Sequence, residues 1–339
     1  MAPLTLAHVV PIVMALLLTA CRAVDGAGGA QSAQLEGWRE GPVPPAVAAA
    51  LAGFTDGEVT VAFRSRATGV WYAHRGDDVL HAASTMKVPV LVALHRAAHR
   101  GELDLTDRMT VRNEFASIVD GSPYALSPED DSDPELYGLV GAQLELAELA
   151  RRMIVRSSNL ATNLLVARLG AGEIQRTIEG LGTRRMSVLR GVEDNKAYAA
   201  GLSNTATAND LAVLLEAIVS GAAVSPEQST EMLAVLEGQE FNELIPAGLP
   251  PGTRVAHKTG SITRILHDAA IVLPDGEPPY VLVVLTRGFD DPARAGAAIR
   301  AVAAAAHGAR RMSSSHSRSV SSSSGSGMPN SASSTSTGG

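Results

Sequence analysis

The chain has 339 residues, of which 45% are hydrophobic, so it is long enough to bury a sizeable core in one large domain or two medium ones. This composition excludes a largely disordered middle section. A formal net charge of -7 at pH 7 gives no basic footprint, which argues against nucleic acid and anionic lipid as partners. The expected ligand is a small molecule.

The N-terminal segment is typical of an export signal. Residues 4–20 form an apolar stretch that is too short for a membrane span. It ends in the sequence LTAC at Cys21, which resembles the lipobox of bacterial lipoproteins. Lipidation would remove the only thiol of the chain from an oxidising compartment, whereas the alternative is an ordinary signal peptide that ends near a cysteine. We expect residues 1–21 to be a signal with lipidation at Cys21, residues 22–35 to be a flexible tether, and the protein to be exported to the periplasm or cell envelope.

The globular part is predicted to cover residues 36–311, because residues 312–339 are mostly Ser, Gly and Thr and predict a disordered tail. It opens with two β-rich runs, 58–65 and 69–74, whose short connection is typical of an antiparallel hairpin. Helical periodicity or good helix formers follow over residues 86–99, 143–155, 158–169, 172–180, 208–219 and 226–236. The chain then returns to β-rich runs at 253–261, 267–273 and 280–286, followed by a closing helix over 291–306.

Two strands at the start and three at the end predict one antiparallel sheet of about five strands, with an all-helical lobe inserted in the middle of the chain. The expected fold class is α/β, of the α+β sandwich type. The natural cleft lies between the sheet and the lobe, where distant segments meet.

The placement of the lysines is informative, since the chain has only Lys87, Lys196 and Lys258 against 25 arginines. A buried lysine can release its proton, whereas arginine cannot. Ser84 and Lys87 form an S-x-x-K motif before a helical run, and positions three apart share a helix face. The Lys87 amine is therefore predicted to lie beside the Ser84 hydroxyl and accept its proton. Pro89 is tolerated only in a first turn, so Ser84 is placed at the helix N-terminus, where its N–H can bind an oxyanion.

A second motif, Lys258-Thr259-Gly260-Ser261, ends a β-rich run. Gly260 permits close approach of another backbone. A substrate is predicted to pair along this edge as an extra strand, while Lys258 and the hydroxyls of Thr259 and Ser261 face a carboxylate. For this motif alone, the alternative is a strand that runs into a turn.

A third motif, Ser157-Ser158-Asn159, opens the predicted helix over residues 158–169. Taken alone, either serine is most simply explained as an N-cap. Taken together and in this order, the three motifs resemble those of the class A β-lactamases and related penicillin-recognising serine enzymes, S-x-x-K, S-D-N and K-T-G. The resemblance extends over residues 58–306.

The resemblance implies a serine hydrolase that opens the β-lactam ring through an acyl-enzyme on Ser84, with Lys87 as its partner in proton transfer. It implies that Ser157, polarised by Lys258, relays a proton to the leaving nitrogen. The backbone N–H groups of Ser84 and Ser261 would form the oxyanion hole. The implied substrate-binding set is Asn159 for the amide, Lys258 for the carboxylate, and Thr259, Gly260 and Ser261.

Glu193 lies where the resemblance places the general base that activates water for deacylation, although a solvated acidic pair with Asp194 is the alternative. Two positions depart from the family pattern. Ser158 replaces an Asp, and there we expect altered packing of the lobe rather than lost chemistry. Ala197 replaces the Asn that helps to hold the hydrolytic water. Either Asn195 or a water-mediated contact substitutes for that Asn, or deacylation is slow.

Two further features receive structural interpretations. Residues 113–141 form an enlarged acidic loop beside the cleft, which we interpret as a solvated surface loop rather than a metal site because no histidine accompanies its carboxylates. His257 and His267 are interpreted as hydrogen-bonded structural residues. No cofactor or metal is expected.

Three functions stay open at this point. The first is a β-lactam hydrolase, and the second is a D-Ala-D-Ala peptidase, amidase or esterase with the same nucleophile. The third is a non-catalytic envelope lipoprotein, against which the complete Ser/Lys set argues. We expect a monomer that takes a β-lactam or a cell-wall peptide, with no nucleic-acid partner and with membrane attachment only through an N-terminal lipid.

Overall fold

The computed structural model describes residues 39–311 and residue 338. The predicted export signal, the lipidation site at Cys21 and the tether over residues 22–35 lie outside the described residues. So does the predicted tail from residue 312 onward, apart from residue 338.

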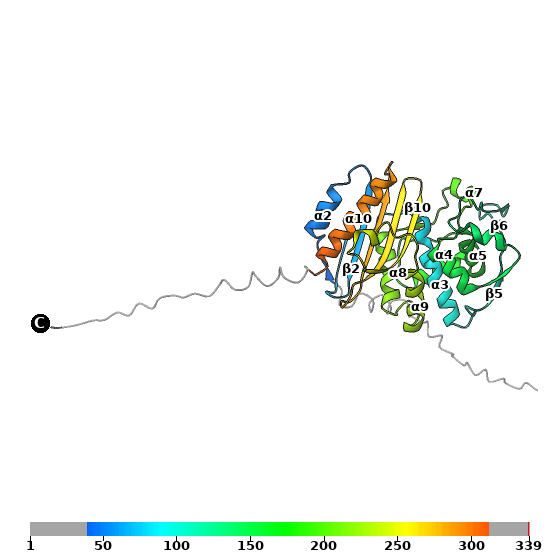
Figure 1. Ribbon diagram of the computed structural model, residues 1–339, viewed down its shortest axis with the longest axis horizontal. Helices are drawn as coiled ribbons and strands as arrows, with labels where there is room; N and C mark the ends of the chain where they lie inside the picture. The colour runs from blue at the N-terminus through cyan, green and yellow to red at the C-terminus, as the bar shows by residue number, and fades with distance from the viewer. Residues whose placement is uncertain (1–38, 312–337, 339) are drawn as a thin grey trace, which may run out of the picture.

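The central sheet is built from β1 (Arg39–Glu40), β2 (Glu58–Ser65), β3 (Val70–His74), β10 (Arg254–Ile262), β11 (Ile265–Leu273) and β12 (Tyr280–Arg287). Their order in the sheet is β1-β3-β2-β12-β11-β10 (Figure 1). All neighbours pair antiparallel except β1, which adds to β3 in parallel. The predicted antiparallel sheet is therefore confirmed, with β1 as an unpredicted sixth strand at one edge and β10 at the other.

Helices cover both faces of the sheet and form the inserted lobe (Figure 1). None of the helices within residues 39–311 is long and apolar enough to cross a membrane. The α-helices are α2 (Pro45–Ala52), α3 (Lys87–His99), α4 (Leu146–Val155), α5 (Asn159–Leu169), α6 (Ala171–Glu179), α7 (Asn195–Ala199), α8 (Ala208–Val219), α9 (Pro226–Glu237) and α10 (Pro292–Ala309). Short 3₁₀ turns are η1 (Ala83–Met86), η2 (Pro134–Leu139) and η3 (Pro246–Gly248).

The strands feed two hydrophobic cores, because successive side chains point to opposite faces of a sheet. In β12, Val281 and Val283 enter the core shared with the lobe, whereas Leu282 and Val284 enter the core under α10. Helices α10 and α2 pack on each other over that second face. On the first face, α8 contacts β2, β11 and β12 and joins the sheet to the lobe.

Helix α3 is the central helix of the lobe. Its side chains are buried on every side from Lys87 to His95, and it contacts α4, α5, α6, α8 and α9. A helix that is apolar nearly all round belongs in an interior. Because Lys87 is the first residue of this buried helix, its side chain is also shielded from water.

The predicted helix over residues 143–155 begins instead with a strand. Residues of β8 (Gln143–Glu145) pair antiparallel with β5 (Arg108–Thr110), and α4 starts only at Leu146. The sequence prediction also did not include α2, α7, or the paired strands β4 (Leu80–His81) with β9 (Thr205–Ala206) and β6 (Phe115–Ala116) with β7 (Pro123–Tyr124). Two-residue strands carry too few side chains for a period to be recognised.

The interpretation of residues 113–141 as a solvated surface loop is wrong for Asp131 and Asp133, although Glu129 and Asp130 in the same acidic run are exposed. Asp131 and Asp133 are only 7% and 1% exposed. Asp133 forms an ion pair with Arg152, with 2.8 Å between Oδ2 and Nη1, and a longer one with Arg156. A buried carboxylate needs such partners, and here they come from α4 and the residue that follows it.

Candidate active site

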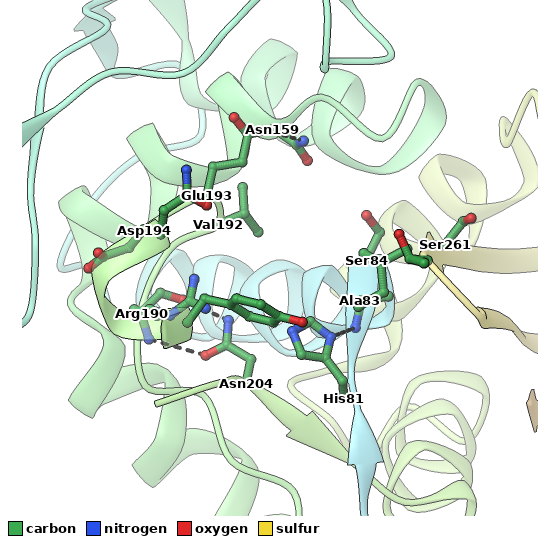
Figure 2. A pocket seen from close by; sticks show the side chains of 14 residues that line it. His81, Ala83, Ser84, Asn159, Arg190, Val192, Glu193, Asp194, Asn204 and Ser261 are labelled. Atoms are coloured by element: carbon green, nitrogen blue, oxygen red, sulfur yellow. Dashed lines mark hydrogen bonds between the residues drawn. The ribbon is translucent and has the colours of Figure 1, made fainter. Parts of the chain in front are cut away.

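A cavity of about 370 Å³ lies between the edge of the sheet and the lobe, where the cleft was predicted. It is lined by η1, the first residue of α5, the segment over residues 190–198 and the end of β10. Figure 2 shows Ser84 and Ser261 together on one side of the cavity and Glu193 with Asn159 on another. The fold therefore brings the predicted motifs into one site.

The backbones of η1 and β10 touch at Gly260, as the sequence predicted. A Cβ atom on Gly260 would lie 3.0 Å from the backbone nitrogen of Ser84 and 3.1 Å from that of Thr85, so a side chain there would displace the nucleophile. Ala83, the residue before Ser84, has φ of 46°, a left-handed conformation that costs energy for a residue with a Cβ. Gly260 thus lets β10 approach the strained turn that carries Ser84.

Lys87 is fully buried and donates hydrogen bonds to three oxygens: Ser157 O at 2.5 Å, Ser157 Oγ at 3.1 Å and Asn159 Oδ1 at 2.8 Å. Burial lowers the pKa of its amine to about 7, although the carboxylates of Asp131 and Glu193 oppose that shift. None of the hydrogen bonds of Lys87 within residues 39–311 goes to Ser84, and in the ammonium form these oxygens take all three donors. The structure therefore shows no hydrogen bond between Lys87 and Ser84, which were predicted from helix spacing to lie side by side; Ser84 lines the cavity, whereas Lys87 is buried behind it against Ser157 and Asn159.

Ser157 lies between the two buried lysines. Its Oγ accepts hydrogen bonds from Lys87 at 3.1 Å and from Lys258 at 3.0 Å, and its φ is 59°. Burial, reinforced by repulsion from Lys87, lowers the pKa of Lys258 well below its ordinary value. The N-cap of α5 is Ser158, whose Oγ accepts from Ala161 N at 3.3 Å. The structure thus separates the two serines: Ser158 caps the helix and Ser157 connects the amines.

The Asn159 side chain connects the amine of Lys87 with the carboxylate of Glu193. Its Oδ1 accepts from Lys87, and its Nδ2 donates to Glu193 Oε1 at 2.6 Å. Glu193 is half-buried, and burial raises the pKa of its carboxyl, with the nearby Asp131 adding to the rise and the Asn159 hydrogen bond opposing it. A carboxylate with a raised pKa is a stronger base near neutral pH.

The segment that carries Glu193 is held by side chains that the sequence analysis did not single out. Val192 donates its N–H to Asn163 Oδ1 at 2.6 Å, and Asn163 Nδ2 donates to Val192 O at 3.0 Å. Asn204 Oδ1 accepts from Leu189 N at 2.8 Å, and its Nδ2 donates to Arg190 O at 2.9 Å. Both asparagines are buried in the folded chain, and this burial is what marks them as structural residues.

Asp194 is not part of a solvated acidic pair. It is 2% exposed and accepts hydrogen bonds from Ser117 Oγ, Ile118 N and Ala197 N, the last as the N-cap of α7. Ala197 is fully buried and presents a methyl group, whereas Asn195 is exposed and lines the cavity. Of the pair, only Glu193 is available for chemistry.

His257 and His267 are both buried and hydrogen-bonded. His257 contacts Asp268 Oδ1 through Nδ1 at 2.9 Å, and burial lowers the pKa of His267 to about 4. They are thus hydrogen-bonded within the core, as expected from the sequence. Within residues 39–311, no group of three or more His, Cys, Asp or Glu side chains is arranged to hold a metal ion.

Comparison with known proteins places these features in context. A family model described as a beta-lactamase enzyme family matches residues 45–309. A beta-lactamase of Rhodobacter capsulatus is 26% identical over 226 residues, which covers 66% of this chain and 73% of that protein. The crystal structure of a beta-lactamase from Sphaerobacter thermophilus is 30% identical, with a TM-score of 0.68, covering 79% of this chain and 97% of that one. A mutant of PBP-A, solved as an acyl-enzyme complex with penicillin-G, is 29% identical, with a TM-score of 0.66, covering 79% and 98%.

Proposed function

Because this chain belongs to the beta-lactamase enzyme family, we propose that Ser84 opens the β-lactam ring as an acyl-enzyme and that Glu193 activates the water that releases the product. The chain is a serine hydrolase of the class A β-lactamase type. The observation that carries the finer proposal is Asn159, whose amide joins Lys87 at 2.8 Å to Glu193 at 2.6 Å beside the cavity that Ser84 lines.

In the acylation half-reaction, Ser84 Oγ attacks the lactam carbonyl carbon and gives up its proton. Lys87, with a pKa of about 7, is partly neutral at physiological pH and is the proposed acceptor, directly or through a water. As the C–N bond breaks, Ser157 donates its hydroxyl proton to the leaving nitrogen and recovers one from Lys87 or Lys258, which both contact its Oγ. The product of this step is an ester on Ser84.

In the deacylation half-reaction, water attacks the ester carbonyl and Glu193 takes its proton. The ester C–O bond then breaks and the proton returns to Ser84 Oγ. The raised pKa of Glu193 supports this assignment, because a carboxylate with a higher pKa takes a proton from water more readily.

Substrate recognition is proposed for the exposed end of β10, which is an edge of the sheet. Thr259 and Ser261 point to the same side of this strand, since side chains alternate. Lys258 is fully buried and contacts Ser157 Oγ at 3.0 Å, and its protonated form is proposed to attract a substrate carboxylate. The N–H groups of Ser84 and Ser261 are proposed as the oxyanion hole. Gly260 supports that proposal by its close approach to Ser84.

A second function is favoured by Ala197. Its methyl group offers no hydrogen bond to a water beside Glu193, and the PBP-A variant above is a structural relative captured as an acyl-enzyme. An enzyme that acylates and then stalls acts as a penicillin-binding protein, with a D-Ala-D-Ala peptide, another amide or an ester as its own substrate.

Intact-mass measurement after mixing with a penicillin separates the two. A mass increase by one penicillin that appears and then disappears, with hydrolysed product accumulating, supports the β-lactamase proposal. A lasting adduct, together with turnover of a D-Ala-D-Ala peptide, supports the second function.

From the sequence of residues 4–21 we also propose export and lipid attachment at Cys21. Wild-type protein is then expected in the membrane fraction, and Cys21→Ser is expected to release it. Soluble wild-type protein whose N-terminus lies downstream of Cys21 would contradict lipidation.

A further inference from the structure

The carboxylate of Asp131 reaches the active site from the acidic segment before α4. Its Oδ2 accepts hydrogen bonds from the backbone N–H groups of Asn159 and Leu160, both at 2.9 Å. Tyr137 donates its hydroxyl to the same oxygen at 3.0 Å, and Asp133 N donates to Oδ1 at 3.0 Å. A buried carboxylate with four donors is held in one orientation.

These contacts complete the N-terminus of α5. The first N–H groups of a helix have no partner within the helix, and Ser158 Oγ accepts only from Ala161 N. Asp131 takes the N–H groups of Asn159 and Leu160, and a negative charge there is favoured by the helix dipole. The carboxylate therefore fixes the backbone from which the Asn159 amide extends.

The segment that carries Asp131 is itself anchored. Asp133 is almost fully buried, accepts two hydrogen bonds from Arg152 and contacts Arg156. Arg156 lies directly before the Ser157–Asn159 motif, and Arg152 lies in the last turn of α4. The acidic segment and the motif are thus attached to each other at two places.

We propose that Asp131 is a positioning residue of the hydrolase, which orients Asn159 between Lys87 and Glu193 and supplies negative charge beside both. The inference rests on the proposed function, because it assigns Asp131 to the alignment of the groups used in acylation and deacylation. No substrate contact is required of Asp131.

The electrostatic part of the proposal has a definite sign. The charge of Asp131 raises the pKa of Lys87 and that of Glu193. Other ionisable groups near this cluster are Asp130 and Tyr124, which interact with Glu193, the Tyr137 hydroxyl, Lys258 beside Lys87, and the ion-paired Asp133. Removing the charge of Asp131 lowers the pKa of both Lys87 and Glu193. In the variant, the deprotonated form of each group, which its half-reaction needs, should therefore persist to lower pH.

The test compares Asp131→Ala, Asp131→Asn and the control Asp130→Asn. Asp130 is the exposed neighbour, so its loss removes a charge without removing the cap. The readouts are the rate of Ser84 acylation by a labelled penicillin, the rate of acyl-enzyme decay, and amide hydrogen exchange at Asn159 and Leu160. Both rates are measured from about pH 4 to 9, roughly the range in which Glu and Lys side chains with shifted pKa values titrate.

Asp131→Ala is expected to slow acylation by roughly 10- to 100-fold, the scale of misplacing reacting groups, and to speed exchange at both amides. Asp131→Asn keeps an oxygen acceptor and is expected to recover most of the rate, with the acid limb of both pH profiles moved to lower pH. Asp130→Asn is expected to leave the acylation rate unchanged and to move the limb for acyl-enzyme decay less, because solvent screens its charge.

The proposal is overturned if Asp131→Ala keeps the wild-type rates, pH profiles and amide exchange. If Asp131→Ala does not fold, an unshifted acid limb in Asp131→Asn overturns it, and a shift to lower pH supports it. A wild-type protein that takes no label overturns the proposed function instead, and hydrogen exchange at Asn159 and Leu160 then still decides whether Asp131 holds the start of α5.

Discussion

The acylation half and the deacylation half of this site are held in different ways. The acylation residues lie in or beside buried elements: Ser84 in η1, Lys87 at the start of α3, Ser157 in the turn before α5 and Lys258 in the middle of β10. Glu193 stands on an irregular segment held by hydrogen bonds between side chains and backbone. Acylation should therefore tolerate loss of a single hydrogen bond to that segment, whereas deacylation should not.

The strongest test of a shared nucleophile is Ser84→Ala, which should abolish both half-reactions. Labelling by a radioactive or fluorescent penicillin is expected to fall to background, because Ser84 is the group proposed to form the ester. The thermal transition should change little, since Ser84 is half-buried and its Oγ carries no hydrogen bond among the described residues. Label retained by the variant would remove Ser84 as nucleophile.

Glu193→Ala should separate the halves most sharply. Ser84 is expected to acylate while acyl-enzyme decay falls by ~10² or more, the scale of removing a general base. In the wild type, the rate of decay needs the carboxylate form, so it should fall as pH falls through a pKa that burial has raised above the ordinary value for Glu. Intact mass over time, with Glu243→Ala as a control outside the site, gives both rates. If wild type and Glu193→Ala hold the adduct equally long, the penicillin-binding function replaces the proposed one.

Lys258→Ala tests recognition within the acylation half. Loss of a charge-assisted hydrogen bond to a substrate carboxylate is worth roughly 1.5 to 3 kcal/mol, or about ten- to a hundredfold in rate constant. The loss in kcat/KM is expected for a penicillin, with a smaller loss for an uncharged ester. Equal losses on the two substrates would mean that Lys258 acts mainly through Ser157 Oγ, which it contacts at 3.0 Å.

Asn163→Ala should give the smallest effect of the four and fall mainly on deacylation. The change removes both hydrogen bonds that Asn163 makes to Val192, next to Glu193. We expect acyl-enzyme decay to slow by about tenfold, the scale of one lost hydrogen bond of about 1.4 kcal/mol, with acylation within about twofold of wild type. Stopped-flow acylation and mass-detected decay on the same sample measure the ratio. An equal slowing of both steps would show that the two halves share one support.

Local patterns in the sequence were sufficient for much of the scaffold. The run at residues 58–65 and the helix at 208–219 were predicted with the bounds that the structure has, because each carries a full local period of apolar side chains. Pro89 predicted the first turn of a helix and Gly260 predicted the close approach of another backbone, and both predictions agree with the structure. The short strands and α7 escaped prediction because tertiary contacts, rather than their own composition, stabilise them.

The sequence by itself singled out the residues that we propose carry the chemistry, since Ser84, Lys87, Asn159, Glu193 and Lys258 lie in or beside short motifs that resemble those of one enzyme family. Only the tertiary structure decided which of two adjacent serines caps α5, and that Asp131, Asn163 and Asn204 hold the backbone around the site. The physical reason is that a single polar side chain has no period. Its role depends on which unpaired N–H or C=O the folded chain brings within hydrogen-bond distance, and a donor 28 or 29 residues away along the chain leaves no mark on the local sequence.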